Sequence, residues 1–187
     1  MKFKTTHLLL LLSSPLVGLN SAFGETCYQL TGTVDTVNLN PFQQTGAIQI
    51  ATYVDDPNNA QYEQSGQIDG VIVGKDQDGL LLLDHTIKFS ANKKGKGSGF
   101  STEYDEAEGT VEKVLLDENG NPILINGEPI PCKINDVKET INHIVNGFGN
   151  FKNVTSANIT AEGTVSFCPG DVNHNHFDLS GGYCVGE

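Results

Sequence analysis

Apolar and polar residues alternate at period two along most of this chain, and turn-forming residues separate the alternating stretches. Clusters of Asn, Asp, Gly and Pro, such as Asp76-Gln77-Asp78-Gly79 and Asn119-Gly120, mark the turns. The pattern therefore indicates an all-β protein. The predicted strands, rich in Val, Ile, Thr and aromatic residues, cover about 26–36, 46–54, 66–73, 80–89, 98–115 with a break, 122–125, 141–145, 154–167 and 176–184.

One segment fits a helix as well as a strand. Asn135 is a suitable N-terminal cap, and a helix from there would place Val137, Ile141 and Ile144 on one face. Gly147 would end such a helix after about three turns. The sequence leaves both alternatives open.

A repeated pentapeptide indicates how the strands are assembled. Ala-Glu-Gly-Thr-Val occurs at 107–111 and again at 161–165, and Gly-Thr-Val recurs at 32–34. On a strand, each copy places its glycine on the apolar face. Glycine in mid-strand is typical of places where a sheet bends or two backbones approach closely. We therefore expect a closed antiparallel β-barrel, with a β-sandwich as the alternative.

The beginning of the chain has the pattern of a secretory signal peptide. Lys2 and Lys4 precede an apolar run centred on residues 8–12, and Ala22-Phe23-Gly24 supplies small residues for cleavage. The run is shorter than the roughly 20 residues of a membrane-spanning helix. We predict a signal peptide at 1–24, no membrane span, and a single secreted or periplasmic domain at 25–187.

Four cysteines follow the predicted cleavage point, and an even number in an exported chain indicates disulfide bonds. Four cysteines allow three pairings. We favour Cys27 with Cys184 and Cys132 with Cys168, because the chain ends meet when a sheet closes into a barrel. Their spacing does not match a zinc site, so no metal and no cofactor are predicted.

The charge of the chain limits the kinds of partner. Removal of the signal peptide leaves nine lysines, no arginine and 23 acidic residues, a net charge of −14. Phosphate groups and nucleic acids are bound mainly by arginine and lysine, so nucleic-acid binding is excluded.

Candidate chemistry is sparse. His85 shares the apolar face of its predicted strand with Leu83, Ile87 and Phe89. An acidic run follows at 103–112, in which Glu106, Glu108 and Glu112 fall on the outward face. No known nucleophile or phosphate-binding motif is present.

A second candidate region covers residues 170–178. Its Asp171-Val172-Asn173 opening is similar to a calcium loop, but Gly182 stands where the bidentate acid is required. His174 and His176 share a strand face and lack a third metal ligand in the sequence.

Several segments together resemble the allene oxide cyclase barrel and dirigent-like superfamily. The segment 144–155, with Gly147-Phe148-Gly149, is similar to that family's glycine-rich motif, and 85–89, 102–106 and 177–184 resemble neighbouring strands. The resemblance implies an eight-stranded antiparallel barrel, commonly assembled as a homo-oligomer. Plant members use acidic groups inside the barrel on apolar substrates, and none of those groups matches a residue here.

The sequence thus predicts an exported, disulfide-bonded barrel without catalysis, a binding or surface-interaction protein whose apolar interior is the candidate ligand site. A cyclase or isomerase acting on an apolar substrate is one alternative, and a structural secreted component is another. Candidate ligand contacts are His85, Phe89, Tyr104 and Phe151. No catalytic residue is assigned.

Overall fold

A computed structural model describes residues 24–54, 60–90 and 96–186. The predicted signal peptide lies, except for Gly24, outside these residues. The described elements are β1 (Thr26–Asn40), β2 (Gln43–Tyr53), β3 (Tyr62–Lys75), β4 (Leu81–Phe89), β5 (Ser98–Val114), β6 (Leu124–Ile125), β7 (Glu128–Pro129), β8 (Pro131–Ile141), β9 (Ile144–Phe148), the 3-10 turn η1 (Gly149–Phe151), β10 (Val154–Ser166) and β11 (Asn175–Val185).

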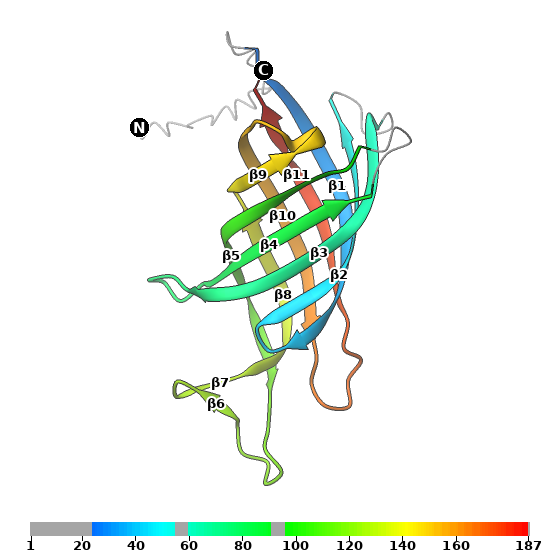
Figure 1. Ribbon diagram of the computed structural model, residues 1–187. Helices are drawn as coiled ribbons and strands as arrows, with labels where there is room; N and C mark the ends of the chain where they lie inside the picture. Colours follow the sequence, from blue (N-terminus) through cyan, green and yellow to red (C-terminus); the bar gives the residue numbers. More distant parts are fainter. Residues whose placement is uncertain (1–23, 55–59, 91–95, 187) are drawn as a thin grey trace, which may run out of the picture.

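Eight of the strands form a closed antiparallel barrel, as the sequence predicts. Neighbouring strands follow the order β4, β3, β2, β1, β11, β10, β8 and β5, and pairing of β4 with β5 closes the ring. This closure excludes the sandwich alternative. β9 is an extra strand on β5, and β6 with β7 forms a separate small hairpin. In Figure 1 this hairpin projects from the end opposite to the start of β1 and the end of β11.

Alternation along the strands divides the barrel into an apolar interior and a polar exterior. On β4, the inward residues Leu83, His85, Ile87 and Phe89 are buried, whereas Thr86 and Lys88 are exposed. The repeated pentapeptide follows the same rule. A Cβ atom on its inward Gly163 would lie 1.9 Å from the carbonyl oxygen of His176 on β11, so only glycine permits this approach of the two strands.

Aromatic side chains fill one end of the barrel. Phe151 of η1 is fully buried, and its ring centroid lies 5.5 Å from that of Phe89, 4.6 Å from Phe100 and 5.1 Å from Tyr183. Tyr183 stacks on Tyr28 at 5.4 Å. These five rings close the end at which β1 begins and β11 finishes.

The segment with two alternatives is a strand, and the helix is wrong. In β8, a register shift opposite Gly163 and Val165 marks a bulge, and Asp136 within it has φ +50°. Because the bulge adds one residue, Ile134 and Val137 both face inward at a spacing of three. The next inward residue, Glu139, is acidic, and the one after it is Ile141. The inward apolar residues are therefore spaced by three and then four positions, which is also the spacing of one face of a helix.

Both disulfide bonds form with the favoured pairing. Cys27 on β1 lies directly opposite Cys184 on β11, and the bond joins the first and last barrel strands. Cys132 at the start of β8 bonds to Cys168 beyond the end of β10. Among the described residues, no helix has the length and apolarity that a helical membrane crossing requires.

Candidate functional site

A large, mainly apolar cavity occupies the end of the barrel opposite the aromatic rings. Its volume is about 960 Å³, comparable to the roughly 300–1,000 Å³ of small-molecule sites. Its walls come from β2, β3, β4, β5, β8, β10 and β11 and from the β6–β7 hairpin. Apolar side chains dominate, among them Leu81, Leu83, Ile134, Val137, Val165 and Phe177.

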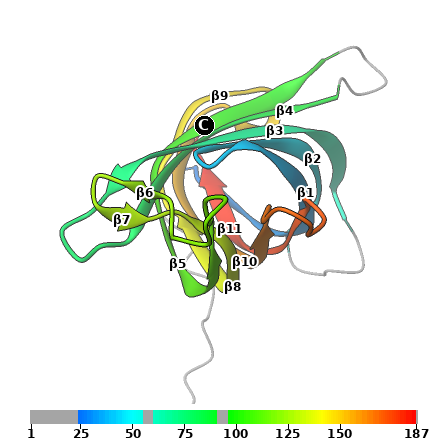
Figure 2. The ribbon, with the colours of Figure 1, turned by 90° about the horizontal axis from the view of Figure 1, so that it is seen from below.

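The small hairpin lies beside the mouth of this cavity. Figure 2, seen from the hairpin's side, shows the barrel strands around a common axis with β6 and β7 at the margin of the ring. Ile125, Glu128 and Pro129 contribute to the cavity wall. Glu128 also pairs with Lys75 at the end of β3, with Nζ and Oε2 2.5 Å apart. The hairpin is therefore attached to the rim of the opening through its own connections to β5 and β8 and through its ion pair with β3.

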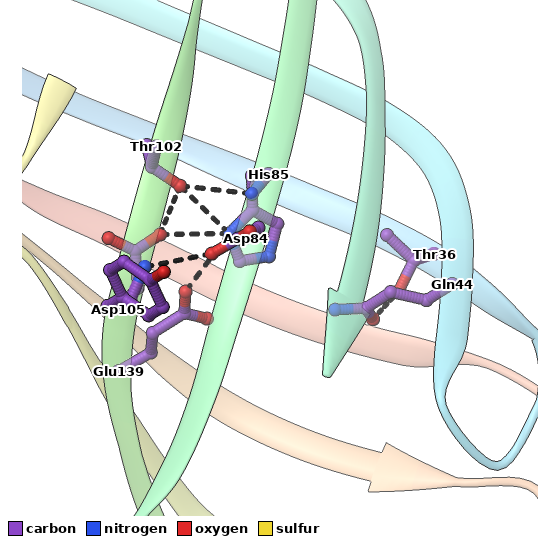
Figure 3. Close-up of polar contacts among 8 residues, drawn as sticks. Thr36, Gln44, Asp84, His85, Thr102, Asp105 and Glu139 are labelled. Carbon is purple, nitrogen blue, oxygen red and sulfur yellow. Dashed lines mark hydrogen bonds and ion pairs between the residues drawn. The ribbon is translucent and has the colours of Figure 1, made fainter. Parts of the chain in front are cut away.

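A buried polar cluster lies deeper in the barrel, where the cavity ends. His85 comes from β4, Asp105 from β5 and Glu139 from β8, and all three side chains point inward. His85 Nδ1 lies 3.0 Å from Asp105 Oδ2 and 3.3 Å from Glu139 Oε1 (Figure 3). Glu139 lines the large cavity, so this carboxyl group connects the cluster with the open end.

A bulge in β5 brings Asp105 into the interior. Leu83 pairs with Asp105 and His85 with Thr102, so β5 has one more residue than β4 across this step. Tyr104 absorbs the extra residue with φ +58°, a left-handed conformation that is uncommon for a non-glycine residue. Thr102 and Asp105 can thus both face inward although they are three positions apart.

Thr102 fixes the orientation of its neighbours in the cluster. Its hydroxyl group donates a hydrogen bond to Asp105 Oδ2 and accepts one from the backbone N–H of His85 at 3.1 Å. On the other neighbouring strand, Gly70 of β3 pairs directly with His85. A Cβ atom on Gly70 of β3 would lie 2.9 Å from His85 Cδ2 and Nε2, so glycine at this position leaves the space that the ring occupies.

The charges of the cluster are strongly coupled. Burial alone lowers the pKa of His85, but the carboxylates of Glu139 and Asp105 outweigh burial and raise that pKa above its ordinary value. Burial also raises the pKa of the Glu139 carboxyl; His85 opposes the rise and Asp105 adds to it. Two buried carboxyl groups require compensating positive charge, from protons or from a bound cation.

Beyond His85 the interior is nearly filled. A void of about 30 Å³ lies among core side chains, and Gln44, His85 and Glu139 contribute to its wall. Gln44 Oε1 accepts hydrogen bonds from Thr36 at 2.8 Å and from buried Asn175 at 3.3 Å. Gln44 pairs with Gly70 and Gly70 with His85, so Gln44 lies two strands along the barrel wall from His85 (Figure 3). The polar cluster thus separates an open apolar chamber from a packed core.

The predicted ligand contacts lie in three environments, and only Phe89 and Phe151, whose ring centroids are 5.5 Å apart, lie together. His85 is in the polar cluster, and Phe89 is buried in the core, where it lines the small void. Phe151 belongs to the aromatic end, far along the barrel from the open mouth. Tyr104 is 64 % exposed and occupies the β5 bulge. The structure therefore brings none of the other three candidates to His85.

Neither Glu139 nor Asp105 stands out in the sequence, where Asp105 is one member of the acidic run at 103–112 and Glu139 falls in the segment that also fits a helix. The run's outward members Glu106, Glu108 and Glu112 are exposed, as expected. Asp105 lies two and four positions before the inward residues Ala107 and Gly109, so alternation along the strand indicates that it also faces inward. Glu139 would have been identified if residues 131–141 had been assigned to a strand, because alternation then places it on the same face as Val137 and Ile141.

The histidines near the end of the chain form a separate, exposed group. His176 Nδ1 lies 2.8 Å and His174 Nε2 3.2 Å from Asp35 Oδ1 on β1. Asp171, the first residue of the calcium-like loop, instead pairs with Lys113 at 3.1 Å.

No protein-family model, curated protein or solved structure matches this chain.

Proposed function

We propose that this protein is an exported binding protein that holds a small, mainly apolar molecule in the open end of its barrel. One observation carries the proposal: an apolar cavity of about 960 Å³ leads from the barrel mouth to the buried carboxyl group of Glu139. A purely structural component would have no use for such a chamber. Buried apolar surface would supply most of the binding free energy, at roughly 25 cal/mol per Å².

The charge of the site narrows the class of ligand. The chain has a net charge of −12, and the innermost polar groups of the cavity include a carboxyl group. A ligand with a carboxylate or phosphate group would be repelled by the negative potential of the chain as a whole. A neutral or cationic molecule avoids this repulsion and can place one polar atom against Glu139. The preferred ligand is thus an apolar, non-anionic molecule.

Two further features support export. Two disulfide bonds in one small domain are typical of an oxidising compartment. The predicted signal peptide at 1–24 would direct the chain there. The resemblance to the allene oxide cyclase and dirigent-like superfamily remains a prediction from the sequence, and it implies the same eight-stranded architecture.

The binding role can be tested with a neutral fluorescent probe, a phenylnaphthylamine, whose emission rises in an apolar site. Ala107 is buried directly opposite Glu139 on the neighbouring strand, so Ala107→Phe would place a ring over the inner end of the cavity. Ala47 is exposed on the outer face of β2, and Ala47→Phe is the matched control. We expect saturable binding by the original protein and by Ala47→Phe, with loss of affinity of at least about tenfold in Ala107→Phe. Equal binding by all three proteins would overturn the proposal.

An isomerase acting on an apolar substrate is the second candidate, and the position of Glu139 favours it. This side chain belongs to the His85–Asp105–Glu139 cluster and also lines the cavity, so a bound molecule would lie against the cluster. Organic extracts of the purified original protein and of Glu139→Gln should then contain different forms of one molecule. Identical extracts would contradict catalysis and leave the binding role intact.

A further inference from the structure

The atoms around His85 Nδ1 indicate a second kind of binding site, next to the apolar cavity. Three oxygen atoms lie within 3.3 Å of His85 Nδ1, from Asp105, Glu139 and Thr102. A ring nitrogen carries at most one hydrogen, so it cannot bond to all of them. Asp105 Oδ1 and Glu139 Oε1 are both buried and have no hydrogen-bond partner among the described residues. Unpaired buried carboxylate oxygens are costly, and native structures rarely retain them without a reason.

The geometry points to a cation at this position. We propose that His85, Asp105 and Glu139 bind a divalent transition metal of the zinc class. One ligand atom from each residue lies within 4.8 Å of the others. Zn²⁺ bonds to nitrogen and oxygen are about 2.0–2.2 Å long, so the ligands of a tetrahedral site stand roughly 3.3 Å apart. The distances from Nδ1 to Asp105 Oδ2 and to Glu139 Oε1 are 3.0 and 3.3 Å.

The charges also balance. Two carboxylates and a neutral imidazole compensate a divalent ion, which leaves no net charge in the apolar interior. The mixture of one imidazole and two carboxylates suits zinc, manganese or cobalt better than soft metals that prefer sulfur. Thr102 would orient Asp105 through its hydrogen bond to Oδ2, as outer partners do at metal sites.

The cluster also has a route to the outside. Glu139 lines the large cavity, so a metal can arrive through the barrel mouth, and the remaining coordination position would face this chamber. Three protein ligands with one open position are typical of zinc sites that bind water or a small molecule. The metal site does not depend on the proposed ligand, because zinc binding can be measured with the cavity empty of any added molecule.

Two other groups on the described chain could be confused with this site. Glu25, Cys27 and Cys184 lie close together, but both sulfur atoms belong to a disulfide bond. The exposed group around Asp35 brings His174 and His176 to one carboxylate. This surface group can bind metal weakly, and it provides the natural control.

The experiment uses the full exported chain, stripped of metal with a chelator and titrated with Zn²⁺ in a calorimeter. We expect one site per chain, with affinity reduced by about a hundredfold or more in His85→Gln and in Glu139→Gln, because loss of an outer partner alone costs about 10–100-fold. The double variant His174→Gln/His176→Gln should keep the site. Titration with Co²⁺ adds a visible spectrum that reports imidazole and carboxylate coordination inside the protein.

Glu139→Gln conserves the shape of the side chain, and its circular dichroism spectrum and thermal unfolding show whether it folds. If the folded Glu139→Gln variant binds Zn²⁺ as the original protein does, the proposal is wrong. It is equally wrong if the original protein binds no Zn²⁺, or if the surface double variant abolishes binding. Should both cluster variants fail to fold, a rise in the unfolding temperature of the surface variant with Zn²⁺ supports the site, and its absence overturns it.

Discussion

The carboxylate of Asp84 accepts a hydrogen bond from the backbone N–H of Tyr104, with Oδ1 and N 2.9 Å apart. This bond holds the β5 bulge, in which Tyr104 has φ +58°. The bulge in turn brings Asp105 next to His85. A contact of Asp84, outside the cluster itself, therefore helps to position the polar groups inside the barrel.

Substitutions at Tyr104 should reveal the strain of this bulge. A β-branched residue is especially unfavourable at positive φ, so Tyr104→Val should lower the free energy of unfolding by about 1–2 kcal/mol. Tyr104→Gly removes an exposed side chain but accepts the backbone conformation, so it should change stability by less than about 0.5 kcal/mol. Urea unfolding measures both. If the Tyr104→Val and Tyr104→Gly variants are equally stable, the strained bulge is not present.

Loss of the Asp84 hydrogen bond should have a smaller and more local effect. Asp84→Ala should destabilise the protein by about 1 kcal/mol, the usual net contribution of one hydrogen bond. Hydrogen exchange of the Tyr104 amide should become faster in this variant, while amides of the β1–β11 pairing keep their protection. Unchanged exchange at Tyr104 would argue against the bond.

The two disulfide bonds should stabilise the fold to different extents. They join residues 157 and 36 positions apart. If the main effect is to restrict the unfolded chain, replacing Cys27 and Cys184 by Ser should cost about 5 kcal/mol, and replacing Cys132 and Cys168 about 4 kcal/mol. Denaturant unfolding of the two double variants measures these losses. The reverse order would show that local contacts at the second bond matter more than loop length.

Phe151 should stabilise the barrel without taking part in binding at the open end. The ring is 0 % exposed and packs against Phe89, Phe100 and Tyr183, so Phe151→Ala should cost about 3–5 kcal/mol. Probe affinity, measured under conditions where the variant remains folded, should stay within about twofold. A large loss of probe affinity with intact fold would place the ligand at the aromatic end instead.

The stabilisation contributed by the exposed pair of Asp35 and His176 should be lost at both high and low pH. The hydrogen bond between them raises the pKa of His176 and lowers that of Asp35. Its stabilisation should be present between about pH 4 and 6.5, the ordinary values of the two groups. It is lost above this range as pH rises through the raised pKa of His176, and below it as pH falls through the lowered pKa of Asp35.

Both side chains of this pair are about half exposed, so the stabilisation should be below about 1 kcal/mol. NMR titration of the His176 ring in metal-free buffer should show its pKa falling toward the ordinary value in Asp35→Asn. Asp178→Asn is the control, because Asp178 Oδ1 is 3.8 Å from the other ring nitrogen. An equal fall in both variants would contradict the specific pairing with Asp35.

The barrel and its disulfide bonds could be predicted because they rest on regular features. Period-two alternation shows directly which residues face inward, as His85 and Phe89 do on β4. Inward glycines such as Gly163 indicated that strands approach closely and curl into a barrel. The pairing of Cys27 with Cys184 follows from closure, because the first and last strands then lie side by side.

The polar site could not be predicted in the same way, since it depends on irregular backbone. Bulges at Tyr104 and at Asp136 change the register of β5 and β8, and a bulge leaves only a weak trace in sequence. The meeting of Asp105 and Glu139 also depends on the pairing of β5 with β8, two strands that lie side by side in the barrel. Alternation along one strand carries no information on that arrangement.

Mapping a bound probe by NMR tests the central claim most directly, that the open end of the barrel is a binding chamber. The protein is titrated with the neutral phenylnaphthylamine while methyl resonances are followed. Saturable shifts should appear at Leu83, Ile134 and Val137, which line the cavity, while Val154 and Val185 at the aromatic end remain unchanged. Shifts confined to the outer face, or no saturable shift at any cavity methyl group, would contradict the account.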